Sequence, residues 1–207
     1  METPSYQKAK DKMAIRRPHI SIITLNVKWT ELTNKKAQNC RMDQKTKHNQ
    51  CCLRETLLNS KDIYRFKVKG WKMIFQANGI QRKSRVAILI SDKVDFKIKK
   101  VKKDTESYFI MKKGIMHQED ITFINIYAPN QGPLKYVKQL LIELKGETDE
   151  NINIVGGLNT PLSDIDRSPK QKINKEITSL NDTLDQLDII YIYRAFPPPN
   201  SCLYIFL

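Results

Sequence analysis

The sequence has no long apolar run. None of its apolar stretches approaches the ~20 residues that a membrane-spanning helix needs. The N-terminal stretch METPSYQKAKDKMAIRRPH is charged and has no apolar core, so it does not resemble a secretory signal. We therefore expect an intracellular protein of the nucleus or cytoplasm, neither secreted nor bound to a membrane.

Cysteine is scarce and irregularly spaced. The four cysteines are Cys40, Cys51, Cys52 and Cys202. Two of them are adjacent, so no disulfide framework is indicated, and a reducing compartment fits best. His48 lies near three of them, but the spacing matches no zinc-binding pattern. The sequence therefore favours a core held by apolar packing.

Acidic residues are outnumbered. The 207 residues include 36 Lys and Arg against 22 Asp and Glu, a formal net charge of +14. Between Lys61 and Lys113 there are 16 basic and 5 acidic residues. This excess favours DNA or another polyanion as a partner. The alternative is a solvated surface whose lysines serve solubility. No protein partner can be inferred.

Apolar periodicity predicts an α/β fold in one domain, with a polar leader over residues 1–18 and the folded part over residues 19–207. Runs with strand character are HISIITLNV, FKVKGWKMIFQAN, SRVAILISD, VDFKIKKVKKD, YFIMKKG, ITFINIYAP, NINIVGG and LDIIYIYR. Helices are predicted from Pro133 to Gly146 and after Ser168, each with an apolar stripe. Because the chain ends on the apolar SCLYIFL, we expect it to be cut short.

Polar side chains follow several of these strands. They are Asn26, Glu55, Tyr127 with Asn130, and Asn159. Strand ends from different parts of a sheet sandwich converge at one edge, so these side chains could share a cleft. Singly, each has an ordinary explanation as a turn former, a surface carboxylate or a core tyrosine with its hydroxyl at the edge.

Taken together and in order, these stretches resemble the endonuclease domain of mammalian LINE-type retrotransposon proteins. That domain is a branch of the endonuclease/exonuclease/phosphatase superfamily. The matching stretches are ISIITLNV, CCLRET, KVKGWKMIFQANG, VAILISDKVDFKIK, DITFINIYAPN, IVGGLNTPL and DRSPKQKINKE, followed by LNDTLDQLDII. They cover about residues 19 to 196, nearly the whole chain.

The resemblance implies a four-layer α/β sandwich of two mixed sheets that hydrolyses DNA phosphodiester bonds with Mg²⁺. It assigns Glu55 to the metal-ligand carboxylate and Asn26 to the asparagine beside the metal. Tyr127 matches the tyrosine that contacts the scissile phosphate, and Asn159 matches the asparagine of a GDFN motif. One carboxylate anchoring a hard cation, with neutral donors around the phosphoryl oxygens, is suitable chemistry for this reaction.

The sequence departs from the pattern of that family at the catalytic aspartate. Gly157 stands where the GDFN motif has the aspartate that orients or deprotonates the attacking water. Loss of a general base lowers rates by about 10²–10⁴. Arg54 replaces a glutamine, and Ser84 with Arg85 replaces an alanine-glycine pair. The C-terminal Ser-Asp-His motif is absent from the sequence, so we also expect the last strands of the sandwich to be missing.

Three functions stay open. The first is a degenerate, truncated endonuclease relative that is catalytically inactive. The second is a residual Mg²⁺-dependent endonuclease, with Asp164 or Asp166 replacing the lost base. The third is a non-catalytic, basic nucleic-acid-binding protein. The candidate nucleic-acid-binding residues lie in one lysine-rich strand and are Lys97, Lys99, Lys100, Lys102 and Lys103.

Overall fold

The computed structural model describes residues 20–26, 49–58, 70–77, 84–147, 151–162, 175–190 and 205–206. The predicted leader lies outside these residues, and so do Asp164 and Asp166.

Four strands form the first sheet, in the order β1-β2-β4-β3. They are β1 (Ile22–Asn26), β2 (Gln50–Leu58), β3 (Trp71–Gln76) and β4 (Ser84–Ser91). β1 and β2 are parallel, whereas β4 is antiparallel to both of its neighbours. The apolar run of β4 is buried from Val86 to Ile90, as a central strand covered on both faces requires. The first sheet is therefore mixed, as predicted.

Five strands form the second sheet, in the order β5-β6-β7-β8-β9. They are β5 (Phe96–Lys103), β6 (Phe109–Met116), β7 (Glu119–Tyr127), β8 (Ile152–Gly157) and β9 (Ile205–Phe206). β7 and β8 are parallel, and the other pairs are antiparallel. The two described residues near the end of the sequence, Ile205 and Phe206, thus form a short strand that pairs with β8.

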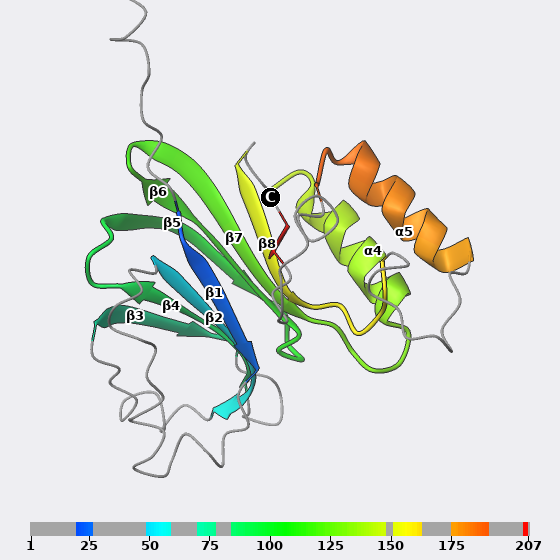
Figure 1. The fold of residues 1–207 in the computed structure, drawn as a ribbon, viewed down its shortest axis with the longest axis horizontal. Coiled ribbons are helices and arrows are strands. Elements are labelled where there is room, and N and C mark those ends of the chain that lie inside the picture. Colours follow the sequence, from blue (N-terminus) through cyan, green and yellow to red (C-terminus); the bar gives the residue numbers. More distant parts are fainter. Residues whose placement is uncertain are drawn as a thin grey trace, which may run out of the picture.

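The two sheets pack face to face, as Figure 1 shows, and enclose an apolar core. The core includes Ile88 from β4 and Phe123 from β7, both almost fully buried. One amide spans the interface between the sheets. Asn125 Nδ2 donates to the carbonyl oxygens of Leu53 (3.0 Å) and Ala87 (2.9 Å). This buried link aligns β7 with β2 and β4, and so aligns the ends of the two sheets.

Two helices cover the other face of the second sheet (Figure 1). They are α4 (Pro133–Leu144) and α5 (Lys175–Gln186). The predicted stripe of α4 is buried, and it ends at Leu144, two residues before the predicted stop at Gly146. In α5, Ile177, Leu180 and Leu184 are buried as predicted, whereas the predicted start of this helix lies outside the described residues.

One expectation about a strand was wrong in part. Leu187 to Ile190, the described part of the predicted strand LDIIYIYR, form a turn and an irregular segment. There Asp188 takes a left-handed conformation (φ 53), and the N–H of Ile189 donates to the carbonyl of Leu184 (3.0 Å), which caps α5. In β5, Ile98 and Val101 are exposed, because β5 is an edge strand whose register shifts between Ile98 and Lys100.

A lysine occupies the core between the sheets. Lys112 is fully buried on β6, on the same face of the strand as Ile110 and Met116. In the sequence it is one of the 16 basic residues of the segment from Lys61 to Lys113, for which contact with DNA or with solvent was expected. No helix in the described part of the chain is both long and apolar enough to cross a membrane.

Candidate functional site

Three of the predicted residues meet at one edge of the sandwich. Asn26 ends β1 and lies in register with Arg54 of β2, so it is next to Glu55. Glu55 Oε1 accepts hydrogen bonds from Asn26 Nδ2 (2.9 Å) and from the Tyr127 hydroxyl (3.1 Å). The carboxylate therefore joins β1 and β2 of the first sheet to the end of β7 in the second sheet. We call this edge the rim site, comprising Asn26, Glu55, Tyr127, Gly157 and Asn159.

An irregularity in the backbone of β2 directs the side chain of Glu55 toward the rim site. The register of β2 against β4 shifts between Arg54 and Leu58, and Glu55 has φ 55 in the left-handed region. A non-glycine residue in this region is uncommon and costs about 1 kcal/mol or more. Such irregularities in strands often redirect a side chain next to a functional site. No sequence signal marked this bulge.

Tyr127 acts as a hydrogen-bond donor in the rim site. Burial raises the pKa of its hydroxyl, and the adjacent Glu55 carboxylate that accepts its hydrogen bond raises that pKa further. The nearby Asn159 side chain and the positive charge of Arg85 oppose this rise in pKa. The tyrosine therefore stays protonated at neutral pH and donates to Glu55.

Asn159 follows β8 and has φ 52, also in the left-handed region that asparagine tolerates. Its Nδ2 donates to the carbonyl of Ala128 (2.5 Å) and to Oδ1 of Asn130 (3.2 Å). These bonds fasten the loop after β8 to the loop after β7. The structure thus places Asn130 and Asn159 together beside Tyr127, as their positions after neighbouring strands predicted.

Gly157 lies in register with Tyr127 across the parallel pair β7 and β8. A Cβ atom at this glycine would lie 2.6 Å from Nη1 of Arg54 and 3.7 Å from Cδ2 of Tyr127. The Arg54 guanidinium therefore fills the space that a side chain at position 157 would take. The sequence showed the two substitutions separately but could not show that one side chain replaces the other in space.

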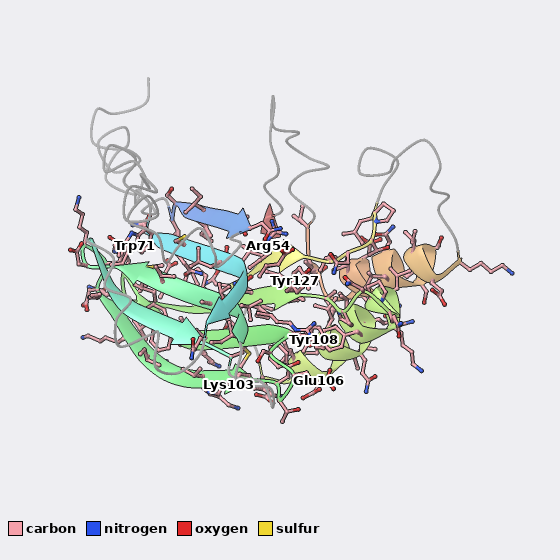
Figure 2. The ribbon with its side chains drawn as sticks, turned by 90° about the horizontal axis from the view of Figure 1, so that it is seen from below. Arg54, Trp71, Lys103, Glu106, Tyr108 and Tyr127 are labelled. Atoms are coloured by element: carbon pink, nitrogen blue, oxygen red, sulfur yellow. The ribbon has the colours of Figure 1, made fainter. Side chains whose placement is uncertain are left out.

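Two further residues of the rim were not predicted as site residues. The Arg85 Cζ lies 4.4 Å from the centroid of the Tyr108 ring, and the Tyr108 ring packs edge-on against Tyr136. The carbonyl of Tyr108 accepts a hydrogen bond from the N–H of Tyr127 (2.7 Å). Figure 2 shows Arg54, Tyr108 and Tyr127 in the same part of the molecule. The unusual arginine at position 85 was the one signal in the sequence for this cluster.

The predicted nucleic-acid-binding lysines lie on β5, the edge strand of the second sheet. Three of the five are engaged in ion pairs with carboxylates. Lys99 pairs with Asp120, Lys100 pairs with Glu147, and Lys102 pairs with both Glu143 and Glu147.

The other two lysines, Lys97 and Lys103, form no ion pair in the part of the chain that the structure describes. Lys103 pairs with Ile110, which in turn pairs with Asn125, two residues before Tyr127. Lys103 is therefore nearer the rim site, whereas Lys97 lies toward the opposite end of β5.

The rim site offers a magnesium ion one carboxylate, with a guanidinium beside it. Mg²⁺ takes oxygen ligands and is usually bound through one or two carboxylates. Glu55 is the one carboxylate among the predicted site residues, and the Arg54 guanidinium places positive charge where a second carboxylate would stand. Within the described ranges, no three His, Cys, Asp or Glu side chains gather in a way that could hold a metal.

No family model matches the sequence. Solved structures nevertheless share its architecture. The endonuclease domain of TRAS1, a telomere-specific non-LTR retrotransposon, is 13% identical with a TM-score of 0.61, over 91% of this chain and 84% of that one. The AP endonuclease LMAP from Leishmania major is 14% identical with a TM-score of 0.68, over 90% and 78%. This chain has the endonuclease/exonuclease/phosphatase fold.

Another structure with this fold is the 3′ phosphatase NExo from Neisseria, solved with a product DNA hairpin. It is 16% identical with a TM-score of 0.61, over 90% of this chain and 85% of that one. The predicted fold class is thus confirmed, with two mixed sheets and helices that pack on the second sheet. In this endonuclease/exonuclease/phosphatase fold, the rim site lies where the ends of β1, β7 and β8 meet the bulge of β2.

Proposed function

We propose that this protein is a relative of LINE-type retrotransposon endonucleases that binds DNA but does not cleave it. One observation carries the proposal: Gly157 has no side chain, and the Arg54 guanidinium takes the space of one. A guanidinium stays protonated at all accessible pH values, so it cannot accept a proton from an attacking water. The general base expected at position 157 is therefore replaced by a permanent cation.

DNA binding is supported by charge and by similarity. The chain carries a net charge of +14, and Arg54, Arg85 and Lys103 lie at or near the rim. NExo, which has the same fold, was solved with a DNA hairpin. Contacts between basic side chains and phosphates supply most of the affinity in sequence-independent binding. We expect affinity for DNA of any sequence, falling steeply with salt.

A second candidate function is a residual Mg²⁺-dependent endonuclease. It is favoured by the intact hydrogen-bond network of Glu55 with Asn26 and Tyr127, which keeps the carboxylate ordered at the rim. Cleavage would need a base from elsewhere in the chain, and the proposed replacements Asp164 and Asp166 lie outside the described residues.

Nicking of supercoiled plasmid tests the two functions against each other. Purified protein is assayed at low salt with Mg²⁺ and with a chelator, beside a Glu55→Ala variant. We expect no nicking above the level of this variant, while a fluorescently labelled oligonucleotide binds in an anisotropy titration. Nicking that needs Mg²⁺ and disappears in Glu55→Ala would establish the residual endonuclease instead.

A further inference from the structure

The Arg54 guanidinium lies at the rim without its full set of partners. Its Nε is buried and has no hydrogen-bond partner among the residues that the structure describes, and its Nη1 lies beside Gly157. A guanidinium has five N–H donors in a planar fork that matches the oxygens of a phosphate. An unpaired buried donor is costly unless a ligand or water satisfies it. The guanidinium can occupy this position because residue 157 is glycine; a Cβ atom there would overlap Nη1 of Arg54.

Arg85 brings a second guanidinium to the same edge. Its Cζ lies 4.4 Å from the Tyr108 ring centroid, so its positive charge lies over the ring. Such a cation–π contact engages the charge of the guanidinium and leaves N–H donors able to bind a ligand. Arg85 forms no ion pair within the described ranges. Its positive charge acts on Tyr127 of the rim site and lowers the pKa of the tyrosine hydroxyl.

The charges of the rim favour an anion. Arg54 and Arg85 bring two guanidinium groups to the rim, where Glu55 is the one carboxylate among the rim-site residues and already accepts two hydrogen bonds on Oε1. The carboxylates of Asp104 and Glu106 act on Tyr136, which packs against Tyr108. The remaining predicted residues, Asn26, Tyr127 and Asn159, are neutral. Mg²⁺ is bound through one or two carboxylates together with the oxygens of a substrate phosphate, whereas a guanidinium can bind that phosphate directly.

We propose that the rim site holds a phosphate group of DNA directly through the guanidinium groups of Arg54 and Arg85, without a bridging divalent metal. This inference rests on the proposed DNA binding and specifies where and how a phosphate is recognised. Arg54 takes the role of the cation, Arg85 adds a second fork, and Glu55 opposes the bound anion because it carries like charge. The sign of the effect of Glu55 therefore separates this mode from a metal-bridged one.

The test measures the dissociation constant for a fluorescein-labelled single-stranded DNA oligonucleotide by anisotropy, with a chelator and with Mg²⁺. We expect the same affinity in both. Arg54→Gln should weaken binding about tenfold, as expected for the loss of a charge-assisted hydrogen bond. The salt dependence should fall by about one phosphate contact. Lys93→Gln is the matched control, because Lys93 is exposed in the turn after β4, at the opposite end of that strand from Arg85.

Two further variants give results that misfolding cannot imitate. Glu55→Gln should bind the oligonucleotide more tightly, whereas loss of a metal ligand would weaken a metal-bridged complex. Gly157→Asp should weaken binding without making it depend on Mg²⁺, because the new carboxylate would pair with the Arg54 guanidinium. Combining it with Arg54→Gln frees the carboxylate, so calorimetry should then detect Mg²⁺ binding that the unmodified protein lacks.

The outcomes separate the two levels of the proposal. If the oligonucleotide binds but Arg54→Gln and Lys93→Gln lose affinity equally, DNA binding stands and the rim phosphate site is refuted. The same holds if the chelator abolishes binding, or if Glu55→Gln weakens it. If the folded protein does not bind DNA at low salt, the proposed function itself fails.

Discussion

Replacing Lys112 by methionine should raise the free energy of unfolding by several kcal/mol at neutral pH. Lys112 is fully buried between the sheets, and its Nζ has no hydrogen-bond partner in the described part of the chain. The nitrogen lies 3.3 Å from the centroid of the Phe75 ring and 4.7 Å from that of Phe96. Burial in these apolar surroundings lowers the pKa of Lys112 from 10.5 to about 6.

The size of the effect follows from the proton that the unfolded chain binds. At pH 7 the lysine is neutral in the folded protein but protonated in the unfolded chain. Each pKa unit corresponds to about 1.36 kcal/mol, so the interval from pH 7 to the unfolded pKa of 10.5 costs about 5 kcal/mol. Methionine has a similar volume and no charge, so it removes the penalty without leaving a cavity.

The same linkage fixes the direction of the pH dependence. Because the unfolded chain binds more protons, stability should rise from pH 6 upward, toward 10.5. Cys52 acts in the opposite direction, since burial raises the pKa of its thiol from 9.0 to about 12 and stability is lost as pH rises above 9.0. The two contributions cancel between pH 9.0 and 10.5, where the protein should be most stable.

Urea unfolding followed by circular dichroism at pH 6, 7.5 and 9 measures these changes. The control is Lys97→Met, because Lys97 is exposed on the neighbouring strand and its replacement should change stability by no more than about 0.5 kcal/mol. In Lys112→Met the rise in stability between pH 6 and pH 9 should disappear. If this variant unfolds at the same urea concentration as the unmodified protein at pH 7.5, the lysine is not a buried neutral amine and the reasoning is refuted.

Three other substitutions and one control test the fold. Gly156→Ala should destabilise the protein by more than about 3 kcal/mol in urea unfolding, because Gly156 has φ 134 and an added Cβ would overlap the backbone of Ile126. Gly146→Ala, which meets open space, should leave the urea midpoint unchanged. Asn125→Leu should lower the free energy of unfolding by about 2 kcal/mol through the loss of two buried hydrogen bonds; an unchanged midpoint would show that the amide does not hold the sheets together. Glu147→Gln should flatten the acid limb of a pH titration, because Lys100 and Lys102 lower the pKa of Glu147 from 4.5 to about 2 and this stabilisation is lost as pH falls through that interval; an unaltered acid limb would contradict this account of the ion pairs.

Local sequence patterns predicted most of the fold. Alternation and β-branched runs located β4, β6 and β7, and the stripe from Leu134 to Leu144 located α4. These signals are strong because each element buries one whole face. Ile98 and Val101 are apolar but exposed, because they lie on the edge strand β5. Periodicity alone does not distinguish an edge strand from a central one.

The sequence indicated several residues that lie together at the rim site, but it did not indicate the balance of charge there. Resemblance and strand-end positions selected Asn26, Glu55 and Tyr127, and the structure joins all three by hydrogen bonds. The meeting of Arg54 with Gly157 depends on the packing of β2 of the first sheet against β8 of the second, which no local pattern encodes. The burial of Lys112 is a similar case, since a lysine in an alternating strand predicts an exposed face.

The buried amide of Asn125 has a consequence for how chemistry can change on this scaffold. It sets the alignment of the two sheets from inside, through backbone carbonyls whose hydrogen bonds do not depend on any side chain at the rim. Residues 54, 85 and 157 can therefore be exchanged while the geometry that brings their strands together is kept. A site for a divalent cation and a site for an anion then differ by a few side chains on the same framework. Successive substitutions can therefore convert one site into the other while every intermediate variant still folds.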